Sequence, residues 1–554
     1  MSRRYSRREM LARTAAGLAV GFVGGSKCFG TDLSRSGAIV GETAGAEVGK
    51  NVLASAGNAV DAAVGAALTS AVATPARCGI AGYGGHMIIA LKSGKVTCID
   101  FNTMGPAAAR PDMYPLDEKG EVKGGTNLHG WLAIGVPGTL AGLQLALDRY
   151  GTKPFRELVQ PAIEVAKNGF VLSPGTAKTI RGAAARFRND PGSAKLYLDK
   201  NGEARAPGDL MRNPDLAQLL STLAERNSVD SFYRGDIAQR LAEAFQKNHG
   251  LVTAKDLAEY HAREVEPLRL SWNGMDIFTP PPTAGSLTIL EACSILKALD
   301  WASMPDGPAS THAQLESLRL AWKDRLELLG DPEKVDVPIE KLLSTGYASE
   351  MASKVKQAVN SKKALPIEIQ KHLDEGTNNI SCVDHEGNMV AVTLTQGSSF
   401  GAQVTANGLG LTLGHGMSRF DPHPDRPNSP GPGKRPLHNM CPSAVVRDGK
   451  PIMAVGAAGG VRIPNVVFRM LTQYVVRGAT MEKAVAAPRM QTTGTLELGL
   501  EKGWPRADED YLKEAGFSIK PELPLSSVVS AVTFNRQTGE CRGDSRGIAE
   551  QQTH

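Results

Sequence analysis

The stretch LDEGTNNISCVDHEGNMVAVTLTQG, residues 373–397, changes character at Thr377. Residues 360–376 have no sustained period and are expected to form a surface linker that ends before Thr377. After Thr377, β-branched residues flank a short polar turn at 384–388, and this pattern predicts a β-hairpin. Thr377 is therefore either an ordinary residue at the start of a strand or, if the chain is cut before it, a new amino terminus.

Further hairpins and helices surround this one. A second hairpin is predicted at 443–460, with its turn at 447–450, and another at 82–106, with its turn at 92–95. The segment 265–285 is expected to contain one strand followed by a proline-rich turn. Apolar residues at helical spacing predict helices at 49–74, 138–151, 155–169, 235–250 and 285–299. Two adjacent hairpin layers with helical blocks around them predict an α+β fold, a four-layer αββα sandwich.

The composition is that of an ordered globular protein, since 42% of the 554 residues are hydrophobic and 21% are charged. The net charge of +5 is small for this length, and part of it lies near the amino terminus, so no nucleic-acid partner is indicated. The seven cysteines are scattered without a CxxC pair, which argues against a zinc site or a thioredoxin-like motif. One or two disulfides stay open if the compartment is oxidising.

The amino terminus reads MSRRYSRREMLARTAAGLAVGFVGG, with the pair Arg7 and Arg8 ahead of an apolar run at 10–23. That run is too short to span a bilayer as a helix and suits a signal peptide. The motif resembles a twin-arginine export signal, so residues 1–30 are predicted to be a signal segment and the protein to be periplasmic or secreted. An ordinary basic amphipathic terminus is the alternative. No later segment is apolar enough to predict a stable membrane span.

The chemistry open to this chain centres on Thr377. The sequence has no GxSxG elbow, HExxH, P-loop or Rossmann fingerprint. A threonine hydroxyl is a weak nucleophile that needs a base. If the bond between Gly376 and Thr377 were cut, the new α-amine, with a pKa of about 7.7–8.0, could serve as that base. One residue would then supply both nucleophile and base, without a metal or cofactor.

Several motifs in one order carry a resemblance to a known family. They are AGNAVDAAVGAAL at 56–68, GYGGHMIIA at 82–90, TNNISCVDHEGNMVAVTLTQG at 377–397, KRPLHNMCPSAVV at 434–446 and VGAAGGVRI at 455–463. The chain resembles the gamma-glutamyltransferase (glutathione hydrolase) family of N-terminal nucleophile hydrolases. The resemblance implies cleavage of the Gly376–Thr377 bond, which would leave a large subunit, 31–376, and a small subunit, 377–554, in one intertwined fold.

The resemblance also implies roles for four residues. Thr377 matches the family's nucleophile, and Thr395 matches the second threonine, which hydrogen-bonds the hydroxyl of the nucleophile. Gly459 and Gly460 match the glycine pair whose backbone N–H groups form the oxyanion hole. Taken without the family, Thr395 is a strand residue and the glycine pair is a tight turn.

Six positions depart from the family's substrate-binding pattern. They are Asn102, Gly397, Ser418, Arg419, His438 and Asn439. Asn102 stands where an arginine usually holds the substrate's α-carboxylate, and Ser418 and Arg419 replace the acidic pair that usually meets its α-amine. Arg419 could instead bind a carboxylate. The loop 421–434 looks shorter than in family members that carry a lid, so a more open site is expected.

These observations lead to one main hypothesis and two alternatives. The main hypothesis is a self-cleaving threonine amidohydrolase or acyltransferase that acts on a small-molecule amide or peptide through an altered acyl pocket. Genuine gamma-glutamyl transfer, or glutathione hydrolysis, with a rearranged pocket is the first alternative. A non-catalytic periplasmic binding protein of the same fold is the second.

Overall fold

The computed structural model describes residues 32–34, 36–367, 377–521, 523 and 525–547. The predicted signal segment 1–30 and Gly376 therefore lie outside the described residues. No helix within the described ranges is long and apolar enough to cross a membrane. The six described cysteines are all buried, and none of them forms a disulfide.

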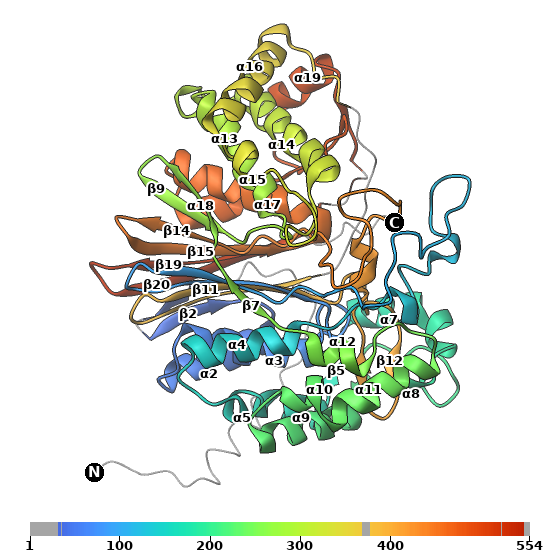
Figure 1. Ribbon diagram of the computed structural model, residues 1–554. Helices are drawn as coiled ribbons and strands as arrows, with labels where there is room; N and C mark the ends of the chain where they lie inside the picture. Colours follow the sequence, from blue (N-terminus) through green and yellow to red (C-terminus); the bar gives the residue numbers. More distant parts are fainter. Residues whose placement is uncertain (1–31, 35, 368–376, 522, 524, 548–554) are drawn as a thin grey trace, which may run out of the picture.

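Two antiparallel sheets stacked face to face form the centre of the molecule (Figure 1). The six-stranded sheet has the order β2-β10-β11-β3-β4-β7, with β2 at Gly37–Val40, β3 at Gly84–Ala90, β4 at Val96–Asp100, β7 at Arg263–Val265, β10 at Asn378–Asp384 and β11 at Met389–Thr395. The seven-stranded sheet has the order β1-β20-β19-β15-β14-β9-β8, with β1 at Asp32–Ser34, β8 at Leu268–Trp272, β9 at Met275–Thr279, β14 at Ser443–Arg447, β15 at Lys450–Ala458, β19 at Val528–Asn535 and β20 at Glu540–Gly547.

Helices cover the outer face of each sheet, which gives the order helices, sheet, sheet, helices (Figure 1). The six-stranded sheet is covered by α2 (Thr43–Ala54), α3 (Ala59–Ala73) and α4 (Thr139–Tyr150), with α5 (Phe155–Leu158), α6 (Gln160–Asn168), α9 (Pro214–Arg226) and α11 (Asp236–Lys247) packed beyond them. The seven-stranded sheet is covered by α13 (Ser286–Ala298), α14 (Pro308–Leu328), α16 (Thr345–Ser361), α17 (Ile463–Leu471) and α18 (Met481–Ala486).

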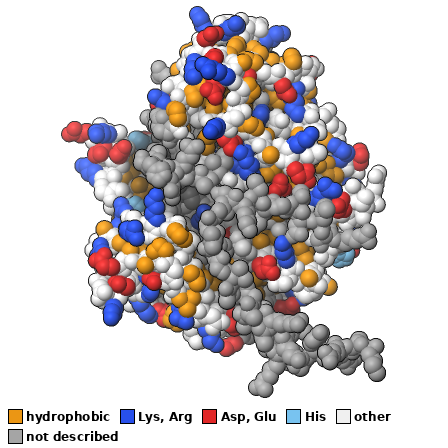
Figure 2. Space-filling model, turned by 180° about the vertical axis from the view of Figure 1, so that it is seen from behind, with side chains coloured by type: hydrophobic (Ala, Val, Ile, Leu, Met, Phe, Trp, Pro, Cys, Tyr) orange, Lys and Arg blue, Asp and Glu red, His pale blue; other side chains and the backbone are white. Residues whose placement is uncertain are grey.

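The remaining elements are short or peripheral. The helices are α7 (Pro174–Arg188), α8 (Pro191–Tyr197), α10 (Asp230–Arg234), α12 (Ala254–Glu259), α15 (Ile339–Leu342) and α19 (Arg506–Glu514). The strands are β5 (Phe170–Val171), β6 (Leu210–Met211), β12 (Thr405–Ala406), β13 (Leu411–Thr412), β16 (Met490–Gln491), β17 (Glu497–Leu500) and β18 (Ser518–Ile519). On the face shown in Figure 2, acidic and basic side chains are interspersed rather than gathered by sign.

Strand alternation sorts the side chains of β10 between two layers. Ile380 and Cys382 join the apolar cluster formed with α3, whereas Val383 joins the cluster between the sheets. That inter-sheet cluster consists of small and aliphatic residues from both sheets, with Ile88, Ala391, Ala444, Ala454 and Val532 among them. All residues of β10 and β11 are buried, because helices cover one face and the second sheet covers the other.

The α+β class and the hairpin turns predicted at 92–95, 384–388 and 447–450 are confirmed. The single helix predicted at 49–74 is wrong, because the chain breaks between α2 and α3. Asn58 caps α3 there, in a capping box with Asp61, and Ala56 adopts a positive φ of 61°. The single strand predicted within 265–285 is also wrong, because Asn273 and Gly274 form the turn of a hairpin between β8 and β9.

Both sheets combine strands from before and after the linker. In the six-stranded sheet, β2 pairs with β10 and β3 pairs with β11. In the seven-stranded sheet, β1 pairs with β20 and β9 pairs with β14. The predicted large and small subunits are therefore joined by four antiparallel ladders.

Candidate active site

Thr377 lies directly before β10 and is 6% exposed. The pairing of β10 with β11 sets Asn378 opposite Leu394, so one further step of the same register sets Thr377 opposite Thr395. Asn379 faces β15 of the second sheet, and Thr377 precedes it by two residues, so Thr377 projects from the same face. The structure thus brings the two predicted threonines together in the layer between the sheets.

The inter-sheet layer becomes polar toward this end of the strands. Thr393 Oγ1 lies 2.7 Å from the side-chain amide of Asn379, which joins β11 to β10. Ser381 Oγ donates to the Ser530 carbonyl oxygen of the other sheet at 2.9 Å. A Cβ on Gly456 of β15 would lie 2.1 Å from the end of the Asn379 side-chain amide, so the glycine makes room for this amide. The polar end is therefore tightly packed around Asn379.

The hydroxyl of Thr395 is oriented by the turn that follows it. The Gly397 N–H donates to Thr395 Oγ1 at 2.8 Å, and Thr395 is 1% exposed. Because the oxygen accepts this bond, the hydroxyl hydrogen is left to donate elsewhere. This arrangement suits a threonine that supports a neighbouring nucleophile.

The glycine pair lies at the end of β15, beyond the residue that packs on Asn379. Gly459 has a φ of 141° and Gly460 a φ of 60°, conformations that residues with a side chain rarely adopt. A Cβ on Gly459 would also lie 2.8 Å from the Cβ of Ser527. The short helical turn η6 (Gly460–Arg462) and α17 follow directly. Backbone geometry therefore requires glycine at both positions, and both lie at the same end of the sheets as Thr377.

Asn102 is fully buried, and its amide nitrogen is already engaged. Nδ2 lies 2.7 Å from Thr283 Oγ1 and 2.7 Å from the Pro436 carbonyl oxygen. Its Oδ1 has no hydrogen-bond partner among the described residues. The side chain thus links β4 to two loops and brings no charge to the position where the family resemblance placed an arginine.

His438 belongs to a buried row of polar side chains that continues through His86 to Asp100. Its Nδ1 accepts the Met440 N–H at 3.2 Å, so its hydrogen lies on Nε2, which is 2.9 Å from Nδ1 of His86. His86 then carries its own hydrogen on Nε2, which lies 3.3 Å from Asp100 Oδ1 but makes no hydrogen bond among the described residues. No sequence motif singled out His86, although strand alternation sets it on the same face as Ile88 and so toward this layer.

Burial sets the charge state of this row. It lowers the pKa of His86 to about 4, with Asp100 opposing the shift, and it holds the pKa of His438 well below its usual range. For Asp100 burial alone would raise the pKa, but His86, Arg435 and Arg263 outweigh it and lower the pKa to about 2. At neutral pH the imidazoles of His438 and His86 are therefore both neutral, and Asp100 is an ionised carboxylate.

The other predicted substrate-binding residues lie in two places. Ser418 and Arg419 end the short helical turn η5 (Gly416–Arg419), and Ser418 Oγ donates to the His415 carbonyl oxygen at 2.8 Å. Asn439 is buried, with Oδ1 3.4 Å from a guanidinium nitrogen of Arg325. The roles assigned to these residues, to Asn102, Gly397 and His438, and to the catalytic four stay predictions.

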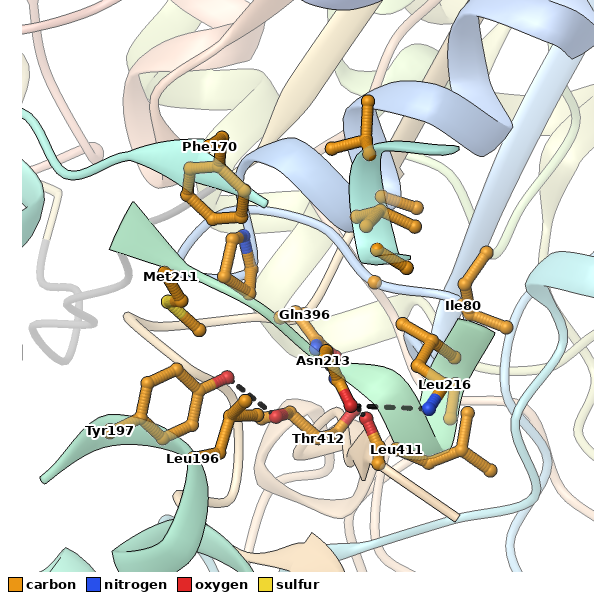
Figure 3. Close-up of a pocket in the computed structure, with 18 residues that line it drawn as sticks. Ile80, Phe170, Leu196, Tyr197, Met211, Asn213, Leu216, Gln396, Leu411 and Thr412 are labelled. Carbon is orange, nitrogen blue, oxygen red and sulfur yellow. Dashed lines mark hydrogen bonds between the residues drawn. The ribbon is translucent and has the colours of Figure 1, made fainter. Parts of the chain in front are cut away.

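The pocket in Figure 3 has none of the polar side chains described above among its lining residues. Its cavity volume is about 20 Å³, and none of its eighteen lining residues is charged. Gln396 contributes its side chain there and donates to the Thr412 carbonyl oxygen at 3.0 Å. Because Gln396 directly follows Thr395 on the chain, its side chain leaves the opposite face of the sheet. This apolar pocket offers no group suited to amide chemistry.

Comparison with solved structures defines the class of protein. A cephalosporin acylase from Bacillus halodurans matches with a TM-score of 0.83 and 25% identity, over 96% of this chain and 98% of that one. The gamma-glutamyltranspeptidase of Helicobacter pylori matches with a TM-score of 0.54 and 33% identity, over 57% of this chain and 90% of that one. The protein has the α+β fold of the N-terminal nucleophile hydrolases.

Sequence comparison then defines the family. The model named "Gamma-glutamyltranspeptidase" matches residues 45–553. The glutathione hydrolase proenzyme of Escherichia coli strain K12 is 36% identical over 472 residues, which are 82% of this chain and 81% of that protein. The acylase ACY 1 proenzyme of Pseudomonas sp. strain V22 is 32% identical over 470 residues, 84% of this chain and 83% of that protein. The chain belongs to the gamma-glutamyltranspeptidase family, and it is a hydrolase or transferase enzyme.

Proposed function

We propose that this protein is a self-cleaving threonine amidohydrolase or acyltransferase whose acyl pocket differs from that of the glutathione hydrolases. The observation that carries the proposal is the register that sets Thr377 opposite Thr395, at the same end of the sheets as the left-handed glycine pair 459–460. Relatives at 32–36% identity are named as proenzymes, which supports cleavage before Thr377.

In the proposed reaction, the α-amine freed at Thr377 accepts the hydroxyl proton while Oγ1 attacks the substrate's amide carbonyl. The N–H groups of Gly459 and Gly460 stabilise the oxyanion of the tetrahedral intermediate. Collapse of the intermediate forms an ester to Thr377, and the protonated α-amine passes its proton to the departing amine. Water, or a second amine, then takes the acyl group and restores the hydroxyl.

An altered acyl pocket is supported by the loss of charge around it. Asn102 brings no cation, and its amide donors are directed to Thr283 and Pro436. His438 is neutral and bound to His86. Arg419 brings a positive charge on η5, where the family resemblance placed acidic residues. We therefore propose acyl donors that end in a carboxylate and lack the α-amine of a γ-glutamyl group.

Cleavage is tested by intact mass and amino-terminal sequencing of the purified protein. Two chains are expected, one of them beginning TNNISC, and Thr377→Ala should stay a single chain without turnover. A wild-type protein that stayed uncut after prolonged incubation would support the non-catalytic binding protein instead. A Thr377→Ala variant that was still split before residue 377 would contradict the mechanism.

The acyl group is tested with three anilides that share the same four-carbon acyl chain and differ in the groups on its last carbon. The γ-glutamyl anilide has both an α-amine and an α-carboxylate, the glutaryl anilide has a terminal carboxylate only, and the butyryl anilide has neither. The glutaryl anilide is expected to give the highest kcat/KM, and Arg419→Gln should reduce that value while leaving the butyryl anilide unchanged. A preference for the γ-glutamyl anilide would instead support genuine gamma-glutamyl transfer.

Export is proposed on the sequence alone, because residues 1–30 lie outside the described residues. The twin arginines 7 and 8 and the apolar run 10–23 support a twin-arginine signal and a periplasmic or secreted location. Replacing both arginines by lysine is expected to keep the protein in the cytoplasm, as measured by cell fractionation. Export of that variant at the wild-type level would overturn the proposal.

A further inference from the structure

His415 connects the turn after Thr395 to a distant loop. The residue is 1% exposed and lies directly before η5. Its Nδ1 is 3.0 Å from the Leu128 carbonyl oxygen, and its Nε2 accepts the Ser398 N–H at 2.5 Å. A carbonyl oxygen can only accept and an amide N–H can only donate, so the ring carries its hydrogen on Nδ1 and is neutral.

The imidazole fills the space that a side chain at position 397 would occupy. A Cβ on Gly397 would lie 1.8 Å from Cδ2 and 1.9 Å from Nε2 of His415. The φ of Gly397 is 96°, so the ring and the backbone conformation both require glycine here. The same glycine donates its N–H to Thr395 Oγ1 at 2.8 Å. Contacts therefore run without a gap from Leu128, through the ring and Gly397, to the hydroxyl of Thr395.

The surroundings of the ring keep it neutral. Burial lowers the pKa of His415 to about 3, and the positive charge of Arg419 on η5 acts in the same direction. The hydrogen bond to Leu128 opposes this shift but does not cancel it. A proton on Nε2 would also remove the acceptor of the Ser398 N–H. His415 is thus suited to holding a position and not to moving a proton.

We propose that His415 is a positioning residue for Thr395. Its contact with Gly397 and its hydrogen bond with Ser398 fix the turn 395–398, and the fixed turn orients the Thr395 hydroxyl. The inference rests on the proposed function, since Thr395 is there the partner of Thr377. With the turn fixed, the Gly397 N–H occupies one side of Thr395 Oγ1, and the hydroxyl hydrogen is directed toward β10, where Thr377 lies across the ladder. Self-cleavage and turnover should both depend on this orientation.

Three substitutions separate the contacts of the ring. His415→Gln can place an amide oxygen where Nε2 accepts from Ser398, His415→Asn can place an amide N–H where Nδ1 donates to Leu128, and His415→Phe fills the space without either bond. Tyr197→Phe is the control. It removes a buried hydroxyl that lies 2.6 Å from Thr412 Oγ1 in the pocket of Figure 3, on the other face of the sheet.

The measurements are the rate at which the precursor splits and, on the split enzyme, kcat, KM and the pH dependence of kcat. His415→Phe is expected to lower the splitting rate and kcat by about tenfold or more, with KM changed less than about threefold. His415→Gln should stay within about threefold of wild type, with an unchanged pH profile, because no proton moves on the ring. Tyr197→Phe should match wild type in all four quantities.

The outcomes are distinguishable. If wild type splits and turns over but His415→Phe matches it, the inference fails and the proposed function stands. If wild type never splits, the proposed function fails first. If His415→Phe does not fold, the His415→Gln and His415→Asn variants decide. An active His415→Gln together with an impaired His415→Asn supports the inference, and the reverse result overturns it. A pH profile that shifted in His415→Gln would assign proton transfer to the ring and would also overturn it.

Discussion

Replacing Glu316 by alanine is expected to destabilise the protein strongly, because it leaves a buried guanidinium without its counter-ion. Glu316 and Arg319 lie on α14, both side chains are 0% exposed, and the guanidinium NH1 is 3.0 Å and 2.8 Å from the two carboxylate oxygens. The pair also holds residue Leu365, whose N–H donates to Glu316 at 2.9 Å and whose carbonyl oxygen accepts from Arg319 at 3.2 Å. This anchors the described start of the linker.

The magnitude follows from the burial. Removing one partner of a buried ion pair costs about 3–5 kcal/mol. The unfolding entropy of about 2.1 cal/mol/K per residue amounts to about 1 kcal/mol/K for a chain of this length. The melting temperature of Glu316→Ala should therefore fall by about 3–5 °C in differential scanning calorimetry.

Two further variants check the reasoning. Glu316→Gln combined with Arg319→Met removes both charges and should recover at least half of the loss, since no unpaired ion remains. Lys323→Ala breaks an exposed pair with Glu327 on the same helix and should shift the melting temperature by less than about 1 °C. A melting temperature of Glu316→Ala within 1 °C of wild type, or a double variant as unstable as the single one, would refute the argument.

Two other predictions concern the polar end of the sheets and its histidines. Gly456→Ala places a methyl group 2.1 Å from the end of the Asn379 side-chain amide, so it should cost about 1–3 kcal/mol of stability and slow self-cleavage. Thermal unfolding and the fraction of precursor that stays intact measure the two effects. Stability should also fall in acid. Burial lowers the pKa of His86 to about 4 and that of His415 to about 3, and holds that of His438 well below its usual range. The unfolded chain binds these three protons near pH 6.5, whereas the folded protein binds them only at lower pH. The contribution of the neutral histidines to the free energy of unfolding is therefore complete above pH 6.5 and is lost as the pH falls toward 4. The loss is up to about 4 kcal/mol per pH unit for three histidines. A melting temperature that stayed flat from pH 7 to pH 5 would contradict this.

The hairpins could be predicted from the sequence because their signals are local. β-branched runs on either side of a short polar turn specify both strands and the turn, as at 384–388. The hairpin of β8 and β9 was not predicted, because the apolar residues of both strands were assigned to one continuous strand. Asn273 and Gly274 between them do carry a turn signal. The helix break at Asn58 was missed for a related reason: the alanine-rich spacing continues across a cap that interrupts it.

The candidate site was predictable only in part, because its contacts are non-local. Thr377 and Thr395 face each other within one hairpin, so the sequence places them together. His86 and His438 are 352 residues apart, and alternation along a strand predicts which face a histidine takes but not which residue it meets there. For the same reason the sequence could not predict that the ring of His415 occupies the space beside Gly397 where a side chain would lie.

The four ladders that join the predicted subunits have a consequence for assembly. Cleavage before Thr377 would break one peptide bond and none of the backbone hydrogen bonds between β2 and β10, β3 and β11, β1 and β20, or β9 and β14. The two fragments would then always be present in a one-to-one ratio, and dilution would not separate them, since separation requires opening both sheets. A fragment supplied separately would have to open both sheets before it could replace a damaged copy in a finished molecule.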